Sequence, residues 1–335
     1  MYEKYYGFKE RPFQLTPNPN WFFASKLHKR ALAYLQYGLS QGEGFIVITG
    51  DVGTGKTTIA NQLLSQLNQD EIIAKQIVTS RLSPDDLIRM IASAFNLVVS
   101  EHSKASYLDA IGSFLKRLHS QHRRALLLVD EAQNLPLEAI EELRMLSNFM
   151  ADGKPLLQSF LLGQNELNAV IQAPDMEQFR QRIIASSNLT PLQVEDTRAY
   201  VEYRIRQAGV TEPLLAEDSF ALIQGFSRGI PRKINTLMDR VFLYGYLEEK
   251  AYLEATDVQA VIDEIMDEVA NLKPVQAENP TRVSDNPNNN ASGNLLNEIS
   301  QLLDNSLETK LKLAKELDQL IQKQQNALKN NPPEQ

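Results

Sequence analysis

The amino-acid sequence predicts an α/β fold in which a central parallel sheet of five strands precedes a small all-helical lid and a C-terminal helical tail. Short apolar runs alternate with segments of helical periodicity as far as about residue 190, a pattern typical of a parallel sheet with helices on both faces. From about 195 to 270 only helical periodicity continues. A stretch rich in Pro and Asn then separates this body from one last amphipathic segment.

The first predicted strand is the apolar run Phe45–Thr49, which leads into a glycine-rich loop of the pattern G-x-x-x-x-G-K-[ST]. Residues 58–64 then continue as a helix. In this context the glycines let backbone N–H groups point at phosphate oxygens, and the helix dipole adds to the attraction. The predicted nucleotide-binding residues of the loop are Gly50, Asp51, Val52, Gly53, Thr54, Gly55, Lys56, Thr57 and Thr58.

Within this loop, Lys56 is expected to reach the β- and γ-phosphates, and the Thr57 hydroxyl is expected to ligate Mg²⁺. The alternative is a glycine-rich turn before a helix, with no ligand. That alternative leaves the Lys-Thr pair and the preceding strand unexplained, so the sequence favours a phosphate-binding loop.

The second strand is predicted over Ile72–Val78, followed by a helix from Ser83 to Leu97 and another over about 104–121. Ser83 precedes a proline at the first helical position and two acids, which together form a helix start signal.

The third strand, 125–129, is continuously apolar and ends in the acids Asp130 and Glu131. Such a run suits a central strand buried on both faces, whose carboxyl end is where open α/β sheets bind ligands. Asp130 is predicted to hold Mg²⁺ and Glu131 to polarise the attacking water. Alone, two adjacent acids more often mark a solvated strand end. Together with the glycine loop about 75 residues earlier, they favour a site that hydrolyses ATP with Mg²⁺.

The remaining elements complete the predicted domains. A helix over about 136–150, a strand over 156–162, a short helical region to 184 and a strand over 185–189 finish the nucleotide-binding domain, residues 1–190. Helices over 195–208, 216–226, 231–247 and 256–270 form the predicted lid, residues 191–271. A flexible linker is predicted over 272–293 and an amphipathic helix, able to form a coiled coil, over 294–329.

The tail helix carries apolar residues at spacings of three or four, which form one face: Ile299, Leu303, Leu307, Leu311, Ala314, Leu317 and Ile321. An isolated helix cannot bury such a face alone. We therefore expect it to pair with itself or with a partner, or to fold back on the body. Membrane association is disfavoured because its polar face is not predominantly basic.

Composition excludes several classes of protein. The chain has no cysteine, so disulfides and thiolate metal sites are excluded. It shows neither a signal-peptide pattern at its start nor an apolar run of membrane-spanning length. A net charge of −8 argues against broad, nonspecific binding to nucleic acid. These features predict a cytoplasmic protein, with any membrane contact peripheral at the inner membrane or made through partners.

With these residues in place, the sequence resembles the AAA+ P-loop ATPases of the general secretion pathway A family. Within that family it is most similar to the secretion ATPases of exosortase and exopolysaccharide loci. The resemblance covers residues 1 to about 270. It is carried by Tyr6-Gly7-Phe8 with Pro12-Phe13, Pro19 before Trp21-Phe22-Phe23, Ala33-Tyr34-Leu35 before Gly42-Glu43-Gly44-Phe45, the acid motif at 129–135, Phe179-Arg180-Gln181-Arg182-Ile183, and 229–235. Family members resembling general secretion pathway A add a transmembrane helix and a periplasmic peptidoglycan-binding part, which we do not carry over to this chain.

The resemblance implies four further site residues. Gln164 would orient the attacking water, although it could instead only cap its strand; the chain departs here from the family's Gly-Gln-Pro-Glu-Leu, having Asn165 in place of proline. Arg180 or Arg182, with Arg182 slightly favoured, would be the arginine finger offered to the neighbouring subunit, while the other could pair with a carboxylate of its own subunit. Arg232 would sense nucleotide from the lid, or serve only its Gly-Pro turn.

The resemblance also implies that the N-terminal aromatic segment covers the adenine, although Phe8, Phe13 and Trp21 could equally belong to the core. It implies assembly into a homo-oligomer through AAA+ interfaces.

The sequence is compatible with three functions. The first is an ATPase switch or motor for export or assembly of a cell-surface polymer such as an exopolysaccharide, with a protein partner in the export apparatus. The second is a DNA-transaction switch of the transposition or initiator type, weakened by the acidic charge and the lack of a basic arm. The third is a nucleotide-dependent scaffold with little turnover, against which Glu131 argues.

Overall fold

The computed structural model describes residues 1–16, 21–80 and 82–271. The chain divides into two compact units, Met1–Gln259 and Ala260–Gln335, and of the second only the end of α12 is described. Pro19, the predicted linker over 272–293 and the predicted tail helix over 294–329 lie outside the described residues. The predicted division of the body at residue 190 stays a prediction.

The first part of the described chain alternates helices with strands. Its elements are α1 (Tyr2–Tyr6), α2 (Lys26–Gln41), β1 (Phe45–Gly50), α3 (Lys56–Ser65), β2 (Ile72–Val78), α4 (Pro84–Ala94), α5 (Lys104–Ser120), β3 (Arg124–Asp130), η2 (Ala132–Asn134), α6 (Leu137–Leu146), β4 (Met150–Ala151), β5 (Lys154–Pro155), β6 (Leu157–Gly163), α7 (Glu166–Gln172), η3 (Pro174–Met176), α8 (Glu177–Arg180) and β7 (Ile183–Leu189). The later part contains α9 (Val194–Gln207), α10 (Ser219–Ser227), α11 (Pro231–Leu247) and α12 (Ala255–Asn271).

The main sheet has five strands in the order β2-β3-β6-β1-β7, and every neighbouring pair is parallel. The predicted five-stranded parallel sheet is therefore confirmed. Because all strands run the same way, the ends of β1, β3 and β6 meet at one edge of the sheet. The glycine loop follows β1, the acid pair lies at the end of β3, and Gln164 follows β6. The fold thereby brings together residues that are far apart in the sequence: Asn165, next to Gln164, bonds Asp51 of the loop across 114 positions.

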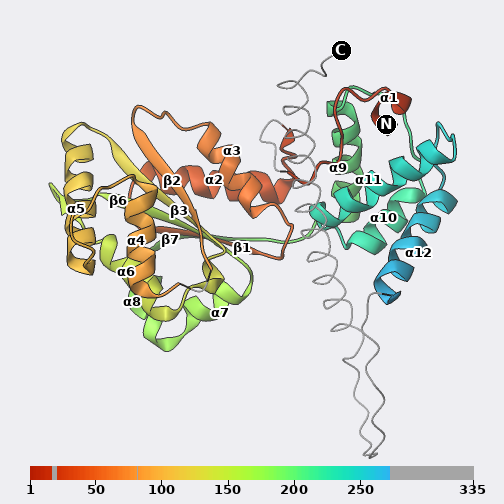
Figure 1. Cartoon of the computed structure of the whole chain (residues 1–335). Helices are drawn as coiled ribbons and strands as arrows, with labels where there is room; N and C mark the ends of the chain where they lie inside the picture. Colours follow the sequence, from red (N-terminus) through yellow and green to blue (C-terminus); the bar gives the residue numbers. More distant parts are fainter. Residues whose placement is uncertain (17–20, 81, 272–335) are drawn as a thin grey trace, which may run out of the picture. The chain divides into compact units, whose positions relative to one another are not determined.

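Successive residues of β1 point to opposite faces of the sheet, as the pleat requires. Phe45 and Val47 belong to the core formed with α4, α5 and α6, whereas Ile46 and Ile48 belong to the core formed with α2 and α3. Figure 1 shows these helices covering the two faces. The continuous apolar character of β1 and β3 follows from this burial on both sides.

Several predicted boundaries are corrected by local backbone geometry. The helix expected to reach Leu97 ends at Ala94, because Asn96 adopts a left-handed φ of 55°. The helix expected over 136–150 begins after Pro136 and ends at Leu146, and the chain then forms the small antiparallel hairpin β4–β5, which the sequence did not predict. The first helix after the glycine loop begins at Lys56 rather than at 58.

The N-terminal aromatic residues pack against the later helices and form ordinary core. Phe8 and Phe13 are 6% and 2% exposed, and their rings lie 5.2 and 5.9 Å from that of Phe242 in α11. Backbone contacts hold the same segment, since the N–H of Lys9 donates to the carbonyl of Ala208 at 2.8 Å. The expectation that Phe8 and Phe13 cover the adenine is therefore wrong, because their apolar surface is already buried here.

Candidate nucleotide-binding site

The glycine loop joins the end of β1 to the start of α3. Gly53 and Gly55 have φ of 82° and 100°, which favour glycine over residues with a side chain. A Cβ at position 53 would lie 2.6 Å from the Cβ of Arg232, so glycine also permits the close approach of the α11 start. The loop and Arg232 are thus adjacent, and the N–H of Arg232 donates to the Gly53 carbonyl at 3.3 Å.

Lys56 is the first residue of α3 and is only 6% exposed. Its Nζ donates to the carbonyls of Gly50 at 2.8 Å and Asp51 at 3.0 Å. Burial lowers its pKa, an effect opposed by the nearby carboxylates of Glu131 and Asp130. A buried cation held by two neutral carbonyls gains a stronger, charge-assisted bond when a phosphate oxygen replaces one of them.

The Thr57 hydroxyl and the Asp130 carboxylate meet directly. Thr57 Oγ1 donates to Asp130 Oδ2 at 2.8 Å, across 73 positions of sequence. Asp130 is 4% exposed, and burial raises the pKa of its carboxyl group. The pair offers two hard oxygen ligands at one point, the donor type that Mg²⁺ prefers. Within the part of the chain that is described, no cluster of three or more metal-ligating side chains occurs, so phosphates and water would complete such a site.

Glu131 lies beside Asp130 with its backbone in the left-handed region, at φ 57°. Its carboxylate Oε2 accepts from Gln133 Nε2 at 2.6 Å and from Gln164 Nε2 at 3.4 Å. The structure therefore brings the two residues predicted to activate and orient water to the same carboxylate oxygen. Asn165 also contacts the loop here, since its Nδ2 donates to Asp51 Oδ1 at 2.6 Å.

Arg180 and Arg182 lie away from these residues, at the opposite edge of the sheet. The carbonyl of Arg182 accepts from the N–H of Phe45, at the start of β1, at 2.9 Å. At about 3.3 Å per residue, roughly 17 Å of strand separates this point from Gly50. Arg180 Nη1 donates to the carbonyls of Ile171 and Ala173, and Arg182 Nη1 donates to Ser147 Oγ at 2.7 Å.

Comparison with known proteins agrees with this geometry. The pattern of the AAA domain family matches residues 39–171. The ADP form of the ORC2 protein of Aeropyrum pernix superposes with a TM-score of 0.59 at 17% identity, over 77% of this chain and 73% of that one. The Cdc6p protein of Pyrobaculum aerophilum gives 0.58 at 18% identity, over 80% and 73% of the two chains. The chain has the AAA+ P-loop NTPase fold.

The chain is also similar to a longer protein whose name refers to secretion. The chain is 39% identical, over 247 residues, to the General secretion pathway protein A of Aeromonas hydrophila. The match covers 73% of this chain and 45% of that protein, so the chain spans under half the length of this relative. No helix among the described residues is long and apolar enough to cross a membrane.

Three residues near the site were not predicted from the sequence: His28, Gln133 and Asn165. His28 is a single histidine on α2, and nothing in its neighbourhood of the sequence marks it. Its Nε2 lies 3.1 Å from the Thr54 carbonyl, and its Nδ1 lies 2.7 Å from Ser25 Oγ. Gln133 and Asn165 were noted only as parts of longer patterns, and their proximity to the loop and acids depends on the strand order.

The contacts of His28 fix one of its two ring protons. Because a carbonyl can only accept, Nε2 carries a hydrogen, whereas the Ser25 hydroxyl can donate to Nδ1 or accept from it. Burial, which disfavours the charged ring, favours the neutral form in which Nδ1 accepts from Ser25. Burial lowers the pKa of His28 below its ordinary value of 6.5, and the bond to Thr54 opposes this in part. The imidazole therefore supports the loop in its uncharged form.

Because of His28, we expect the folded protein to lose stability at acidic pH. Between its lowered folded pKa and the unfolded value of 6.5, the unfolded chain binds more protons, so stability is lost as pH falls through this window. We expect the wild-type Tm to fall more steeply than that of His28→Gln between pH of about 7.5 and about 5.5. Thermal unfolding of both proteins measures this, and parallel slopes would contradict it.

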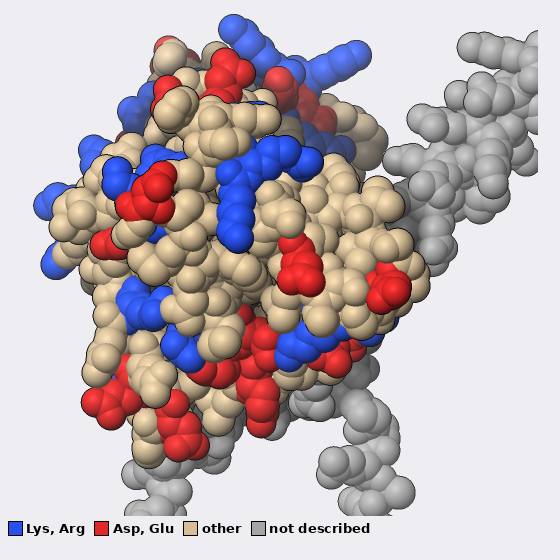
Figure 2. All heavy atoms as spheres, turned by 90° about the vertical axis from the view of Figure 1, so that its left-hand side faces the viewer, with Lys and Arg blue, Asp and Glu red and all other residues tan. Residues whose placement is uncertain are grey.

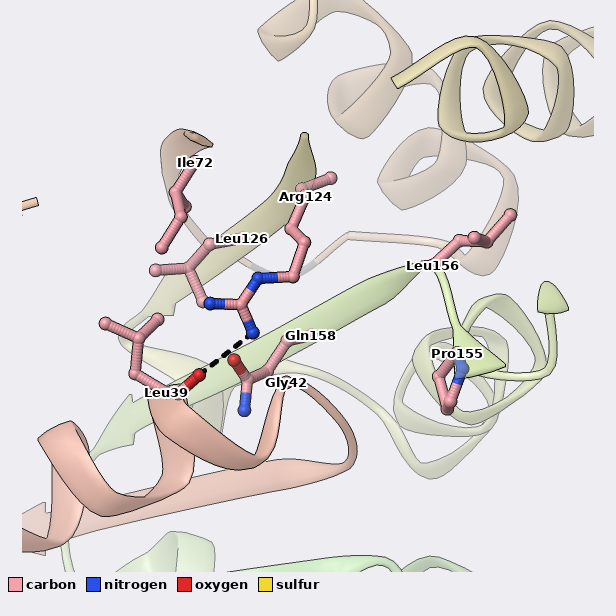
Figure 3. A pocket seen from close by; sticks show the side chains of 9 residues that line it. Leu39, Gly42, Ile72, Arg124, Leu126, Pro155, Leu156 and Gln158 are labelled. Carbon is pink, nitrogen blue, oxygen red and sulfur yellow. Dashed lines mark hydrogen bonds between the residues drawn. The ribbon is translucent and has the colours of Figure 1, made fainter. Parts of the chain in front are cut away.

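A small hollow lies at the opposite edge of the sheet from the glycine loop, where β2, β3 and β6 begin. Figure 3 shows Arg124 there, with its Nη1 donating to the Leu39 carbonyl at 3.1 Å. Gln158 Nε2 donates to the Gly38 carbonyl at 2.6 Å. These side chains satisfy carbonyls at the end of α2. Arg124 and Gln158 therefore hold the C-terminal end of α2 in place. The hollow has a volume of about 10 Å³, enough for roughly one water, so it is too small for a nucleotide.

Proposed function

We propose that this chain is an ATP-hydrolysing AAA+ switch or motor that serves a secretion apparatus, in export or assembly of a cell-surface polymer such as an exopolysaccharide. The observation that carries the enzymatic part is the convergence of Lys56, the Thr57–Asp130 contact and Glu131 at one sheet edge. The process is supported by the similarity to a protein named for secretion.

The proposed reaction uses these residues in order. Lys56 exchanges its loop carbonyls for oxygens of the β- and γ-phosphates, and the loop N–H groups bind the remaining oxygens. Thr57 and Asp130 would hold Mg²⁺, which neutralises phosphate charge when bound. Glu131 takes a proton from water while Gln164 orients that water. The water oxygen bonds to the γ-phosphorus as the bond to the β,γ-bridging oxygen breaks, giving ADP and phosphate.

The position of the arginines supports a site shared between subunits. Arg182 lies beside the start of β1, and the glycine loop follows the end of this strand, roughly 17 Å away. At that distance its side chain cannot contact a γ-phosphate bound by its own loop. An arginine finger at this position must therefore act on the nucleotide of a neighbouring copy. We assign that role to Arg182, because Arg180 is engaged by two backbone carbonyls at the end of α7. Arg182 has one hydroxyl partner at 2.7 Å, which it can exchange more easily. The proposal therefore includes a homo-oligomer.

Arg232 completes the proposed site from the helical part of the chain. Its backbone N–H bonds the loop at Gly53, so a change in the loop on nucleotide binding reaches α11 without an intermediary. We propose that the arginine senses nucleotide in this way. The protein would act in the cytoplasm and reach the inner membrane through partner proteins of the export apparatus.

Replacing Glu131 by glutamine tests the function. The amide keeps the shape of the side chain but cannot take a proton, so turnover should fall by about 10²–10⁴ while ATP affinity stays within about twofold. Phosphate release and equilibrium binding of a fluorescent ATP analogue measure the two quantities. Glu138→Gln, a nearby exposed change on α6, is the matched control and should behave as wild type. Wild-type turnover in Glu131→Gln would show that another group activates the water.

The alternatives predict different results. A DNA-transaction switch, to which the shared fold of an ORC1 structure in complex with DNA gives some support, should shift duplex DNA in a gel when ATP is added. We expect no shift, because the chain has a net charge of −8. On the one face shown in Figure 2, basic and acidic side chains are interspersed. A scaffold with little turnover would bind ATP but release no phosphate.

A further inference from the structure

Gln133 occupies a central position among the proposed catalytic groups. It lies on the short η2 helix two residues after Glu131. Its Nε2 donates to Glu131 Oε2 at 2.6 Å, and its Oε1 accepts from the backbone N–H of Gln164 at 2.9 Å. One amide therefore joins the proposed base at the end of β3 to the tip of β6.

The orientation of this amide is fixed by its two partners. Turning it over would set its carbonyl against a carboxylate and its NH₂ group against an N–H, losing both bonds. Gly163 allows the approach, since a Cβ at that position would lie 3.1 Å from Gln133 Oε1 and 2.7 Å from Leu167 Cδ2. The strand tip is thus shaped so that Gln133 presents a donor, and only a donor, to Glu131.

The backbone and the side chain of Glu131 are held by different residues. Thr79 Oγ1 donates to the Glu131 carbonyl at 2.8 Å, and the N–H of Glu131 donates to Asp130 Oδ1 at 3.0 Å. These bonds fix the main chain in its left-handed conformation. The carboxylate itself accepts a short bond from Gln133 at 2.6 Å and a longer one from Gln164 at 3.4 Å.

We propose that Gln133 is a positioning residue that sets the carboxylate of Glu131 in place for the attacking water and ties it to the sensor strand. The inference rests on the proposed function. A base held by flexible torsions alone samples many positions, and a misplacement of about 1 Å can cost about 10²-fold in rate. Through the same amide, a displacement of the Gln164 backbone moves the donor that holds Glu131. A movement at the end of β6 therefore changes the position of the Glu131 carboxylate.

Gln133→Met tests this, because methionine keeps the length of the side chain and removes both hydrogen bonds. We expect kcat to fall about 10²-fold, with ATP affinity within about twofold of wild type. In a Glu131→Gln background the same change should cause no further loss in single-turnover hydrolysis, since Gln133 acts through the base that is already absent. Gln133→Asn is the second variant, for use if Gln133→Met folds poorly. Its side chain is too short to reach both partners, so its kcat should fall by a similar factor.

Asn134→Ala is the matched control. The side chain of this exposed neighbour on η2 bonds the Thr79 carbonyl, and its bond to the Glu131 carbonyl comes from the backbone N–H, which the change keeps. It should retain wild-type kcat. Unchanged kcat in both Gln133 variants would overturn the inference, as would an equal loss in the wild-type and Glu131→Gln backgrounds. A parallel fall in ATP affinity and Tm would also overturn it, by assigning Gln133 a structural role.

Failure of the proposed function gives a different result. In that case the wild-type chain itself releases no phosphate. If the wild-type chain turns over, Glu131→Gln does not, and Gln133→Met equals wild type, only the inference about Gln133 fails.

Discussion

Lys56→Ala should bind ATP far more weakly than the wild-type protein does. The variant removes the buried cation of the loop, whose Nζ lies within 3.0 Å of the Gly50 and Asp51 carbonyls. Bonds from a charged donor contribute about 1.5–3 kcal/mol each, so losing two to the phosphates weakens binding by roughly 10²-fold or more. Equilibrium binding of a fluorescent ATP analogue measures the change.

Stability provides the control for this variant. Because burial already disfavours the charge of Lys56 and lowers its pKa, we expect its removal to leave the nucleotide-free Tm close to that of wild type. Lys29→Ala, an exposed lysine on α2, should bind ATP normally. Unchanged affinity in a folded Lys56→Ala protein would show that ATP binds somewhere other than the glycine loop.

Arg182→Ala should reduce turnover by about 10³–10⁵, the range attributed to an arginine that stabilises phosphoryl-transfer charge. ATP affinity should change little, because such a group acts mainly on the transition state. Steady-state phosphate release at saturating ATP measures the first quantity, and equilibrium binding measures the second.

Arg180→Ala is the matched control for the finger. Its guanidinium bonds two carbonyls at the end of α7, so its loss should lower Tm while the folded protein retains most of its turnover. The opposite pattern, with turnover lost in Arg180→Ala and kept in Arg182→Ala, would exchange the two roles. Wild-type turnover in both variants would show that neither arginine acts as a finger.

The sequence predicted the sheet because its signals were local. β1 and β3 are apolar on both faces, and each ends in residues whose chemistry implies a ligand, the glycine loop and the Asp130–Glu131 pair. The parallel fold then places these strand ends at one edge without further information. The contact of Thr57 with Asp130 at 2.8 Å follows from that topology.

The residues that were missed depend on side-chain packing rather than on a pattern. His28 acquires its place only when α2 is fixed at one end by Arg124 and Gln158 and brings its other end to Thr54. The role of Gln133 depends on the strand order, which sets the tip of β6 beside β3. The sequence of the N-terminal segment does not show which surface its aromatic rings cover. In the structure, Phe8 and Phe13 pack against Phe242 of α11.

Mixing two inactive variants tests the central claim, a hydrolytic site completed by a neighbouring copy of the chain. Lys56→Ala lacks a working loop but keeps Arg182, and Arg182→Ala has the reverse defect. We expect each variant to be inactive alone and the mixture to recover phosphate release. We also expect the turnover per subunit of the wild type to rise with protein concentration until assembly is complete. No recovery on mixing, together with wild-type turnover that is independent of concentration, would contradict it.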